Sequence, residues 1–420
     1  MAWHPHLWHP TTQVATAPEP LKVVAGRGAL LQLEDGRELI DAISSWWVTL
    51  HGHGQPQIAR AIAEQAQRLE QVIFANFSHG PAEQLAGRLA ALSGLERLFF
   101  SDNGSTAVEV ALKIAWQWWR NRGEPRRRLI AFEGAYHGDT VGAMALGERS
   151  LFTAPFNDLL FAVERAPWPA TWEGDTGVEA REAAALLELE RLLEQPTAAV
   201  ILEPLVQGAS GMAMVRPSFL LAVERRVRAG GALLIADEVM TGFGRTGALF
   251  ACQAAGIRPD LMALSKGLTG GFLPMGVTLA SEVLYQAFIG RDPALTFFHG
   301  HSFTANPLGC AAALASLDLL EAAPAAYAGF EARHRPRLAQ LATAQAALRR
   351  PRCRGTIAAF DLVVEQPGYL NAVGRELQRR CLAAGVYLRP LGNVVYLLPP
   401  LCLSDGQLDQ CYAAIAQGLQ

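Results

Sequence analysis

Lys266 is the side chain with the clearest capacity for covalent chemistry in this sequence. It follows a short apolar run, Asp260 to Leu264, and precedes a glycine-rich turn that ends at Gly271. Partial desolvation in such a place lowers the pKa of a lysine, and a neutral amine attacks carbonyl carbons. The alternative is a surface lysine whose stem lies along apolar neighbours while its charge stays in water. Residues elsewhere in the chain distinguish a nucleophilic lysine from a surface lysine.

A second stretch, FFSDNGSTAVEVALK, predicts an anion-binding turn. An apolar strand is expected to end near Phe100, a polar turn contains Gly104, and a helix begins near Ser105. Backbone N–H groups at the start of a helix have no partner within the helix and can bind an anion. Gly104 and Ser105 are therefore candidate phosphate ligands, although an ordinary helix cap has the same pattern.

Two further candidates lie where strands are expected to end. Asp237 follows the apolar run LLIA, where a carboxylate needs a cationic or N–H partner because its desolvation is costly. A structural hydrogen-bond acceptor or a metal ligand would fit that pattern equally well. Tyr136 lies beside His137 in a glycine-containing loop, where its ring could stack on a flat cofactor or close an edge of the core.

Together these features match what pyridoxal 5′-phosphate requires. The cofactor needs a lysine for covalent attachment, an anion site for its phosphate, an acid at its pyridine nitrogen and an aromatic cover. The same lysine can carry the proton that leaves the substrate Cα. We therefore predict a pyridoxal-phosphate enzyme with Lys266, Asp237 and Tyr136 as catalytic residues.

The elements that must position these residues alternate along the middle of the chain. Short apolar runs recur at residues 97–100, 128–132, 198–202, 232–236, 260–264 and 276–280. Continuous apolar strands between helices indicate an α/β fold, with a mainly parallel sheet covered on both faces. Ligands of such sheets bind at the carboxyl ends of the strands, where Asp237 and Lys266 are expected.

The two ends of the chain are predicted to share a smaller α+β domain. The N-terminal part contains short strands and a hairpin around Asp35 and Gly36, and the C-terminal part mixes helices with strands. We expect residues 1–57 to form the N-terminal part of the small domain and the active-site entrance. Residues 58–309 would form the large cofactor-binding domain, and residues 310–420 the rest of the small domain.

Composition excludes several classes of function. Half of the residues are hydrophobic and only 18% are charged, which favours a buried subunit interface. The net charge of −3 and the lack of a long basic run argue against nucleic acid as a partner. No apolar run approaches the roughly 18 residues of a membrane span. The partners are therefore expected to be small molecules.

The cysteines and histidines give no sign of a disulfide framework or a metal centre. Six cysteines are scattered without a CxxC pair, which is typical of reduced thiols in a cytoplasmic protein. His4, His6 and His9 are separated by prolines and lack further clustered ligands, so we expect no metal.

The whole chain resembles the class III aminotransferases of pyridoxal-phosphate fold type I. The resemblance rests on LLIADEVMTGFGRTGALFACQAAGIRPDLMALSKGLTGGFLPMG, NGSTAVEVALK, AYHGDT and ILEPLVQG. It implies that Lys266 bonds the cofactor, that Asp237 pairs with the pyridine nitrogen, and that Val239 and Tyr136 cover the two ring faces. It also implies that Gly104 and Ser105 hold the phosphate.

Family members are homodimers with active sites at the interface, and the resemblance extends this arrangement to the present chain. The stretch HGHSF would bring Gly300, His301 and Ser302 to the cofactor of the other subunit. The family often has a Pro-Thr pair where this chain has His301 and Ser302. Ser302 keeps the hydroxyl that would contact the phosphate.

Within the family, the likeness is greatest to members that transaminate 8-amino-7-oxononanoate in biotin biosynthesis. It rests on HLWHP, ISSWW, FFHGHSFTANPLGCAAA and LRPLGNVVYLLPP. It implies S-adenosylmethionine as the amino donor and 7,8-diaminononanoate as the product. The substrate-binding residues that it implies are Thr11, Trp46, Trp47, Tyr136, Arg245, Gly300, Arg389 and Tyr396.

The proposed substrate suits these residue types. Tryptophans can line its apolar chain and Arg389 can bind its carboxylate, although core packing and a surface ion pair would explain the same residues. Thr11 stands where a tyrosine is usual. This departure leaves open an ω-amino acid or diamine transaminase that uses pyruvate or 2-oxoglutarate, and an aminomutase of the same fold remains a further alternative.

Overall fold

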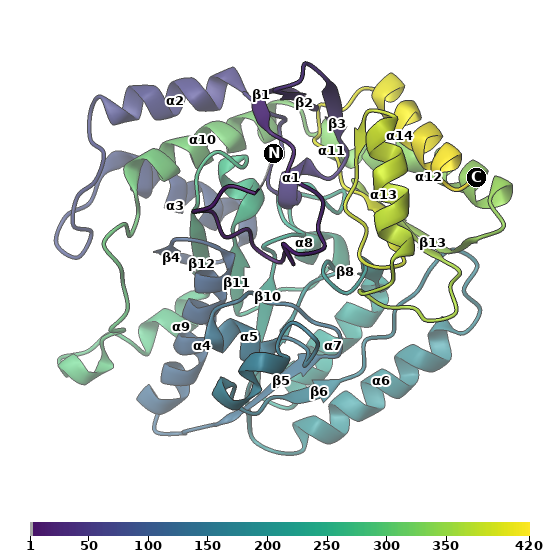
Figure 1. Cartoon of the computed structure of the whole chain (residues 1–420). Helices are drawn as coiled ribbons and strands as arrows, with labels where there is room; N and C mark the ends of the chain where they lie inside the picture. The colour runs from purple at the N-terminus through teal and green to yellow at the C-terminus, as the bar shows by residue number, and fades with distance from the viewer. Residues whose placement is uncertain (1–2) are drawn as a thin grey trace.

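A seven-stranded sheet forms the centre of the computed structural model, which describes residues 3–420 (Figure 1). Every neighbouring pair of strands in it is parallel except the two pairs that β12 makes with β11 and β4. In spatial order the strands are β4 (Arg97–Ser101), β12 (Gly276–Ala280), β11 (Leu261–Leu264), β10 (Leu233–Asp237), β7 (Thr197–Leu202), β5 (Arg128–Phe132) and β6 (Glu164–Ala166). The predicted α/β fold is confirmed.

The apolar runs form strands because both faces of the sheet are buried. All positions of β7 and β10 are buried, and successive residues of β10 point to opposite faces. Leu234 and Ala236 belong to one hydrophobic cluster, whereas Leu233 and Ile235 belong to another on the other face. The inner positions of strands such as β7 and β10 therefore need apolar residues on both faces, which explains the continuous runs in the sequence.

Helices cover both faces of this sheet (Figure 1). The central helices are α2 (Pro56–Ala66), α3 (Gly80–Ser93), α4 (Gly104–Asn121), α5 (Val141–Leu146), α6 (Val178–Leu193), α7 (Pro217–Ala229), α8 (Ala251–Ala255), α9 (Glu282–Gln286) and α10 (Pro307–Ala322). Short 3₁₀ turns occur at η1 (Ala154–Leu159), η2 (Lys266–Thr269) and η3 (Pro293–Leu295), and a small hairpin is formed by β8 (Val206–Gln207) and β9 (Ala213–Met214).

The two ends of the chain meet in a second group of elements. The four-stranded sheet contains β1 (Val23–Arg27), β2 (Leu30–Leu33), β3 (Glu38–Asp41) and β15 (Val386–Tyr387), and the three-stranded sheet contains β13 (Leu348–Arg354), β14 (Ile357–Leu362) and β16 (Val394–Leu397). The helical segments are α1 (Ser44–Trp47), α11 (Ala325–Ala328), α12 (Phe330–Ala344), α13 (Val373–Ala383) and α14 (Asp405–Gly418). β15 pairs with β3, so residues near the N-terminus and near the C-terminus share one sheet and one hydrophobic cluster. The hairpin predicted around Asp35 and Gly36 is confirmed by the antiparallel pairing of β2 with β3.

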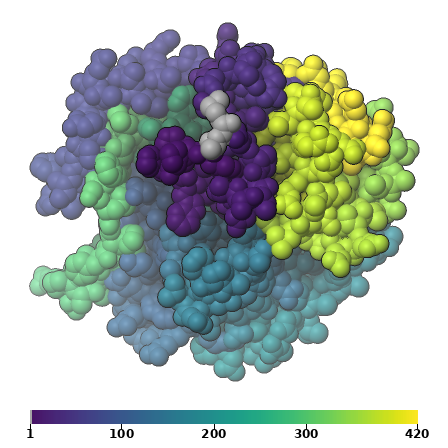
Figure 2. All heavy atoms as spheres, in the orientation of Figure 1, coloured from purple at the N-terminus to yellow at the C-terminus, as the bar shows by residue number. Residues whose placement is uncertain are grey.

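The N-terminal segment, drawn in dark purple in Figure 2, lies on the face where the C-terminal elements adjoin the central body. It is tied to the C-terminal part by a hydrogen bond that the Arg389 guanidinium donates to the Thr11 hydroxyl, at 3.1 Å. This contact brings the start of the chain to the cavity described below.

Membrane and metal criteria give the following results for residues 3–420. No single helix there is long and apolar enough to cross a membrane, and the one combination that qualifies by length and composition is a helix pair, 307–322 and 325–344, bent by 71°. No group of three or more His, Cys, Asp or Glu side chains in the same residues could hold a metal ion. His4, His6 and His9, considered above, belong to this range.

Candidate active site

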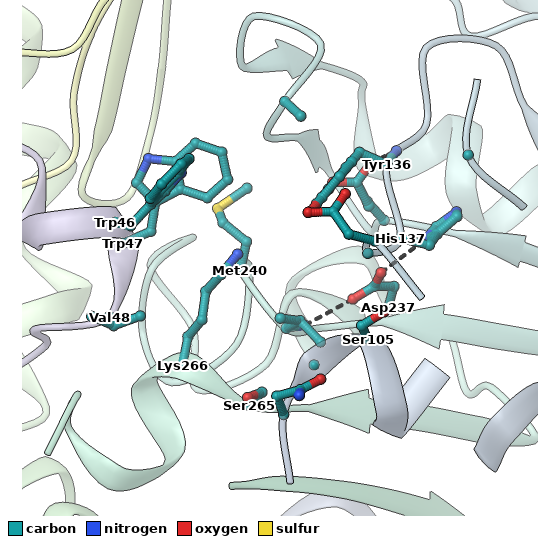
Figure 3. A pocket seen from close by; sticks show the side chains of 18 of the residues that line it. Trp46, Trp47, Val48, Ser105, Tyr136, His137, Asp237, Met240, Ser265 and Lys266 are labelled. Carbon is teal, nitrogen blue, oxygen red and sulfur yellow. Dashed lines mark hydrogen bonds and ion pairs between the residues drawn. The ribbon is translucent and has the colours of Figure 1, made fainter. Parts of the chain in front are cut away.

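A cavity of about 1010 Å³ opens at the carboxyl ends of the central strands (Figure 3). Asp237 ends β10, Lys266 follows β11 by two positions, and Glu203 follows β7 directly. Predicted residues that line the cavity are Thr11, Trp46, Trp47, Gly104, Ser105, Tyr136, Asp237, Val239, Lys266, Arg389 and Tyr396. The fold therefore gathers into one space residues that are separated by up to several hundred positions in the sequence.

Lys266 extends into this cavity from the first position of η2 (Figure 3). Its backbone has a φ of 44°, a left-handed conformation that costs a non-glycine residue about 1–3 kcal/mol. The ammonium nitrogen lies 4.6 Å from the centroid of the Trp47 ring. Burial lowers the pKa of Lys266 to about 8, because desolvation disfavours the charged amine. Near that pH, about half of the Lys266 side chains are neutral and nucleophilic.

The glycine-rich turn after Lys266 lets two loops pass close together. Gly271 has a φ of 85°, and a Cβ at this position would lie 2.7 Å from the carbonyl oxygen of Val48. Val48 directly follows the two tryptophans. Glycine at position 271 therefore allows the Lys266 turn to approach the tryptophan segment.

Asp237 is held by two groups of the chain. One carboxylate oxygen lies 2.7 Å from Nδ1 of the buried His137 side chain, and the other accepts a hydrogen bond from the Val239 N–H at 3.0 Å. In the view of Figure 3, Asp237, His137 and Tyr136 lie on one side of the cavity, and Lys266 with the tryptophans lies on the other. The N–H partner expected for Asp237 is present, whereas no role was predicted for His137.

Glu203 is a further cavity residue that was not among the predicted site residues. Its carboxylate accepts hydrogen bonds from the backbone N–H groups of Tyr136 and Gly208, at 3.2 and 3.1 Å. Burial raises the pKa of Glu203 to about 7. Its position after a buried strand was the available sequence signal. Gly208 lies only five positions further along the chain, whereas Tyr136 comes from a distant loop that no sequence pattern around Glu203 identifies.

The start of α4 forms one end of the cavity and is shaped for close approach. Asn103 caps this helix by accepting the Thr106 N–H at 3.0 Å. A Cβ on Gly104 would lie 2.5 Å from Val239 Cγ1, so only glycine fits here without a shift. The Ser105 hydroxyl lies 2.7 Å from that of Thr140 and faces the same cavity. The helix therefore presents its amide-rich end to the cavity, as a phosphate requires.

The backbone at Trp46 and Trp47 is unusual. Ser44, Ser45 and Trp47 have φ values of 53°, 59° and 67°. The buried Asp41 carboxylate stabilises this turn, because it accepts hydrogen bonds from the N–H groups of Ile43 and Ser45 at 3.2 and 2.6 Å. Such strain persists only where surrounding contacts enforce it, and here it directs both indoles to the cavity.

Contacts with the C-terminal part fix the two tryptophans. The Trp47 indole N–H donates to the Tyr396 hydroxyl at 3.0 Å, and the two rings pack edge to face. The Arg389 guanidinium lies 4.9 Å from the centroid of the Trp46 ring. Arg389 therefore adjoins both Trp46 and Thr11 at the cavity wall, where a substrate carboxylate could reach it.

Arg245 and the HGHSF stretch do not line the cavity of the described chain. Arg245 is 1% exposed and donates hydrogen bonds to the carbonyl oxygens of Pro399 and Trp47, at 2.8 and 3.4 Å. His301 lies 3.2 Å from the Asp102 carboxylate, and the Ser302 carbonyl accepts a hydrogen bond from Gln71 at 2.8 Å. Gly300 is exposed and is likewise absent from the lining. In this structure Arg245 thus contacts main-chain oxygens, including one of Trp47, instead of facing the cavity.

The residues present fit a flat cofactor that carries a phosphate. Lys266 supplies an amine, Asp237 a buried carboxylate, and α4 an open N-terminus, and all three line the same cavity. Tyr136 adds an aromatic ring, and partial burial together with the nearby Asp139 carboxylate raises the pKa of its phenol, so the ring stays neutral. This set has the chemistry that pyridoxal phosphate requires.

Known proteins resemble the chain over nearly its full length. The family model for class-III aminotransferases matches residues 11–419. The adenosylmethionine-8-amino-7-oxononanoate aminotransferase of Synechococcus elongatus is 61% identical, over 99% of each chain. Its namesake from Methanocaldococcus jannaschii has a solved structure with a TM-score of 0.91 and 32% identity, covering 99% of this chain and 96% of that one. An amine transaminase from an uncultivated Pseudomonas species, solved with bound pyridoxal phosphate, has a TM-score of 0.93 and 31% identity, over 100% and 99% of the two chains.

Proposed function

The chain belongs to the class-III aminotransferases, and from this membership we propose that it transaminates 8-amino-7-oxononanoate to 7,8-diaminononanoate in biotin biosynthesis. It is a pyridoxal-phosphate-dependent aminotransferase. We further propose S-adenosylmethionine as the amino donor. The name of the Synechococcus elongatus relative supports both substrates, because the two chains align from end to end at 61% identity.

The observation that carries the substrate proposal is the shape of the cavity beyond Lys266. Trp46 and Trp47 offer an apolar wall, and the Arg389 guanidinium adjoins Trp46 and the Thr11 hydroxyl. An apolar chain with a terminal carboxylate would satisfy both parts of this wall, since arginine binds carboxylates through paired N–H donors. Burial of an uncharged chain against indole rings also favours binding.

We assign the roles of the cofactor-binding residues as follows. Pyridoxal phosphate, when bound, supplies an aldehyde for the substrate nitrogen and a ring that accepts the electron pair left by the Cα proton. Gly104 and Ser105 would hold its phosphate, Asp237 its ring nitrogen, and Val239 and Tyr136 its two faces. Lys266 Nζ would take the proton from Cα of the donor in the first half-reaction and would deliver a proton to the former ketone carbon of the acceptor in the second, because its lowered pKa lets it act as both base and acid.

We propose that the enzyme is a homodimer whose second subunit completes the site. Gly300, His301 and Ser302 lie outside the cavity of their own chain, and Phe298 and Phe303 beside them are 77% and 62% exposed. Apolar exposure of this extent is typical of a subunit interface. His301 and Ser302 would then reach the phosphate of the partner's cofactor.

Two organisational proposals accompany this function. The separate hydrophobic cluster that unites β3, β15 and α12–α14 supports the division into residues 1–57, 58–309 and 310–420, of which residues 1 and 2 lie outside the described part of the chain. A cytoplasmic location is favoured by the six free cysteines.

The alternative is an ω-amino acid or diamine transaminase that uses pyruvate or 2-oxoglutarate. Two observations favour it: Thr11 provides no aromatic wall, and the amine transaminase structure superposes with a TM-score of 0.93. Spectral half-reactions separate the two functions. S-adenosylmethionine and 7,8-diaminononanoate, added separately to the purified enzyme, should each convert the cofactor to its pyridoxamine form. If neither converts it while common diamines or ω-amino acids do, the alternative is correct.

Arg389→Ala should raise KM for 8-amino-7-oxononanoate by about 10- to 100-fold, because it removes a charge-assisted contact to the carboxylate. kcat should change far less, since the carboxylate is remote from the reacting carbon. Steady-state kinetics with Arg389→Lys and Arg380→Ala as comparisons test the assignment. Arg380 carries the same charge on α13 but does not line the cavity, so its variant should match the wild type. An unchanged KM in Arg389→Ala would remove this residue from the substrate site.

Phe298→Asp should weaken the proposed dimer, because it buries a charge in an apolar interface. Light scattering after size-exclusion chromatography should show a shift towards the monomer mass, accompanied by loss of activity at the same protein concentration. Val283→Asp is a matched control, because Val283 is also strongly exposed, at 68%, but lies on α9. A wild-type enzyme that is monomeric and active would contradict the proposal.

A further inference from the structure

We propose that Phe152 and Tyr369 form an aromatic subsite at the rim of the active-site cavity, and that it binds the purine ring of the amino donor. This inference deepens the proposed function and rests on it for the identity of the donor. The two residues come from distant parts of the chain, since Phe152 precedes η1 and Tyr369 lies in the segment between β14 and α13.

The two rings are arranged as a preformed binding wall. Their centroids are 4.6 Å apart and their planes cross at 76°. Both rings line the cavity that contains Lys266, yet they remain 48% and 40% exposed. In an edge-to-face pair the edge of one ring covers one face of the other, so both faces of the first ring and the second face of the other are left for a third ring.

Hydrogen bonds order the backbone segments that carry the two rings. On the Phe152 side, the Ser150 N–H donates to the Thr153 hydroxyl at 2.9 Å, and the Phe152 N–H donates to the Ser150 hydroxyl at 3.3 Å. These bonds fold residues 150–153 into a tight turn. A wall that is already ordered loses less conformational entropy when a ligand binds.

The segment that carries Tyr369 is fastened to the turn after Arg389. The Gly368 N–H donates to the Asn393 side chain at 2.9 Å. Gly392 allows this approach, because a Cβ there would lie 2.0 Å from the Gly368 carbonyl oxygen. The segment is therefore anchored to the strand region that also supplies Arg389 and Tyr396.

Size and charge favour a nucleoside-containing donor for this subsite. The cavity of about 1010 Å³ is at the upper limit of the roughly 300–1,000 Å³ usual for pockets of drug-sized ligands, so it has room beyond the cofactor and a nine-carbon substrate. Asp139 and Glu148 place carboxylates on the cavity wall, which suits a cationic donor such as a sulfonium. A purine ring would add stacking on the aromatic pair.

Adenosine binding tests the subsite separately from transamination. In the pyridoxal-phosphate-loaded enzyme, Phe152→Ala and Tyr369→Ala should each weaken adenosine binding by about tenfold in calorimetric titrations. Tyr369→Phe should retain the wild-type affinity, because the ring and not the hydroxyl forms the wall. Phe156→Ala is the matched control: Phe156 is exposed to a similar degree in the adjacent η1 turn but does not line the cavity.

Half-reactions show whether the subsite belongs to the donor. The S-adenosylmethionine concentration for half-maximal conversion should rise about tenfold in the two alanine variants, whereas that for 7,8-diaminononanoate should stay within about twofold. If the half-maximal concentrations of both compounds rose equally, the two rings would only pack the fold, and the proposal would be overturned. A wild-type enzyme that does not bind adenosine would also overturn it. If S-adenosylmethionine fails to convert the wild type but adenosine binding still depends on the two rings, the donor assignment falls and the subsite stands.

Discussion

Lys266→Ala should lower the rate of transamination by about 10⁴-fold or more, because Lys266 is the proposed covalent attachment point and the group proposed to move the Cα proton. The variant should still bind pyridoxal phosphate without a covalent bond, since the α4 start, Asp237 and Tyr136 are unchanged. Rates of the two half-reactions, followed by the absorption of the cofactor, provide the measurement. A variant that keeps wild-type turnover would exclude Lys266 as the reactive amine.

The small number of lysines in the chain makes it straightforward to identify the lysine that bonds the cofactor. The sequence contains only three lysines, Lys22, Lys113 and Lys266. Borohydride reduction of the loaded wild type should therefore add the mass of the reduced cofactor to the peptide with Lys266. Lys22→Ala is the control, because Lys22 is an exposed partner of Glu34 and should be labelled and active like the wild type. Label on another lysine would refute the assignment.

The central sheet and the positions of Asp237 and Lys266 could be predicted because strands buried on both faces have a recognisable apolar sequence pattern. Strands covered on both faces must be apolar throughout, so β5, β7 and β10 appear as unbroken runs. Polar residues within two positions of such runs are then easily recognised, and this pattern identifies Asp237 and Lys266. Both positions follow from local pattern together with one rule about the edges of parallel sheets.

Other parts of the site depend on contacts that no local pattern specifies. Arg245 was expected at the cavity, but its long side chain runs to carbonyl oxygens of Pro399 and Trp47. Its direction depends on how the C-terminal part packs behind the tryptophans. Glu203 directly follows its strand, yet its raised pKa results from burial, and one of its two backbone partners, Tyr136, comes from a distant loop.

The HGHSF stretch could not be assigned a role from local sequence pattern, for a different reason. Its residues do not line the cavity of their own chain, and Phe303 within it and Phe298 beside it are exposed. A sequence carries the information for a subunit interface only through such unexplained apolar positions. In the proposed homodimer, the role of Gly300, His301 and Ser302 would depend on a second copy of the chain and not on the fold of the first.

Asp237→Asn should reduce kcat by about 10²–10³-fold while leaving the fold intact. The amide has the shape of the carboxylate but no negative charge, so it stabilises the protonated cofactor ring less well. Loss of one preorganised electrostatic partner in a water-excluded site typically has an effect of this size. Asp237 is 4% exposed, so its proposed interaction with the ring nitrogen would be largely unscreened. Half-reaction rates with 7,8-diaminononanoate measure the effect at the chemical step, independently of the donor.

Asp260→Asn separates this electrostatic effect from general damage to the sheet. Asp260 immediately precedes β11 at the opposite edge, where its carboxylate accepts the Leu234 N–H at 2.8 Å, and it does not line the cavity. Its variant should lose some thermal stability but keep kcat within about twofold, because it removes the negative charge that pairs with Arg228 and leaves a weaker, neutral acceptor for the Leu234 N–H, outside the cavity. Asp237→Asn should show the reverse: a melting temperature near that of the wild type and a large kinetic defect. If the two variants lose activity in proportion to stability, the carboxylate at position 237 is structural, and the charge that supports the ring must come from elsewhere, with Glu203 the first candidate.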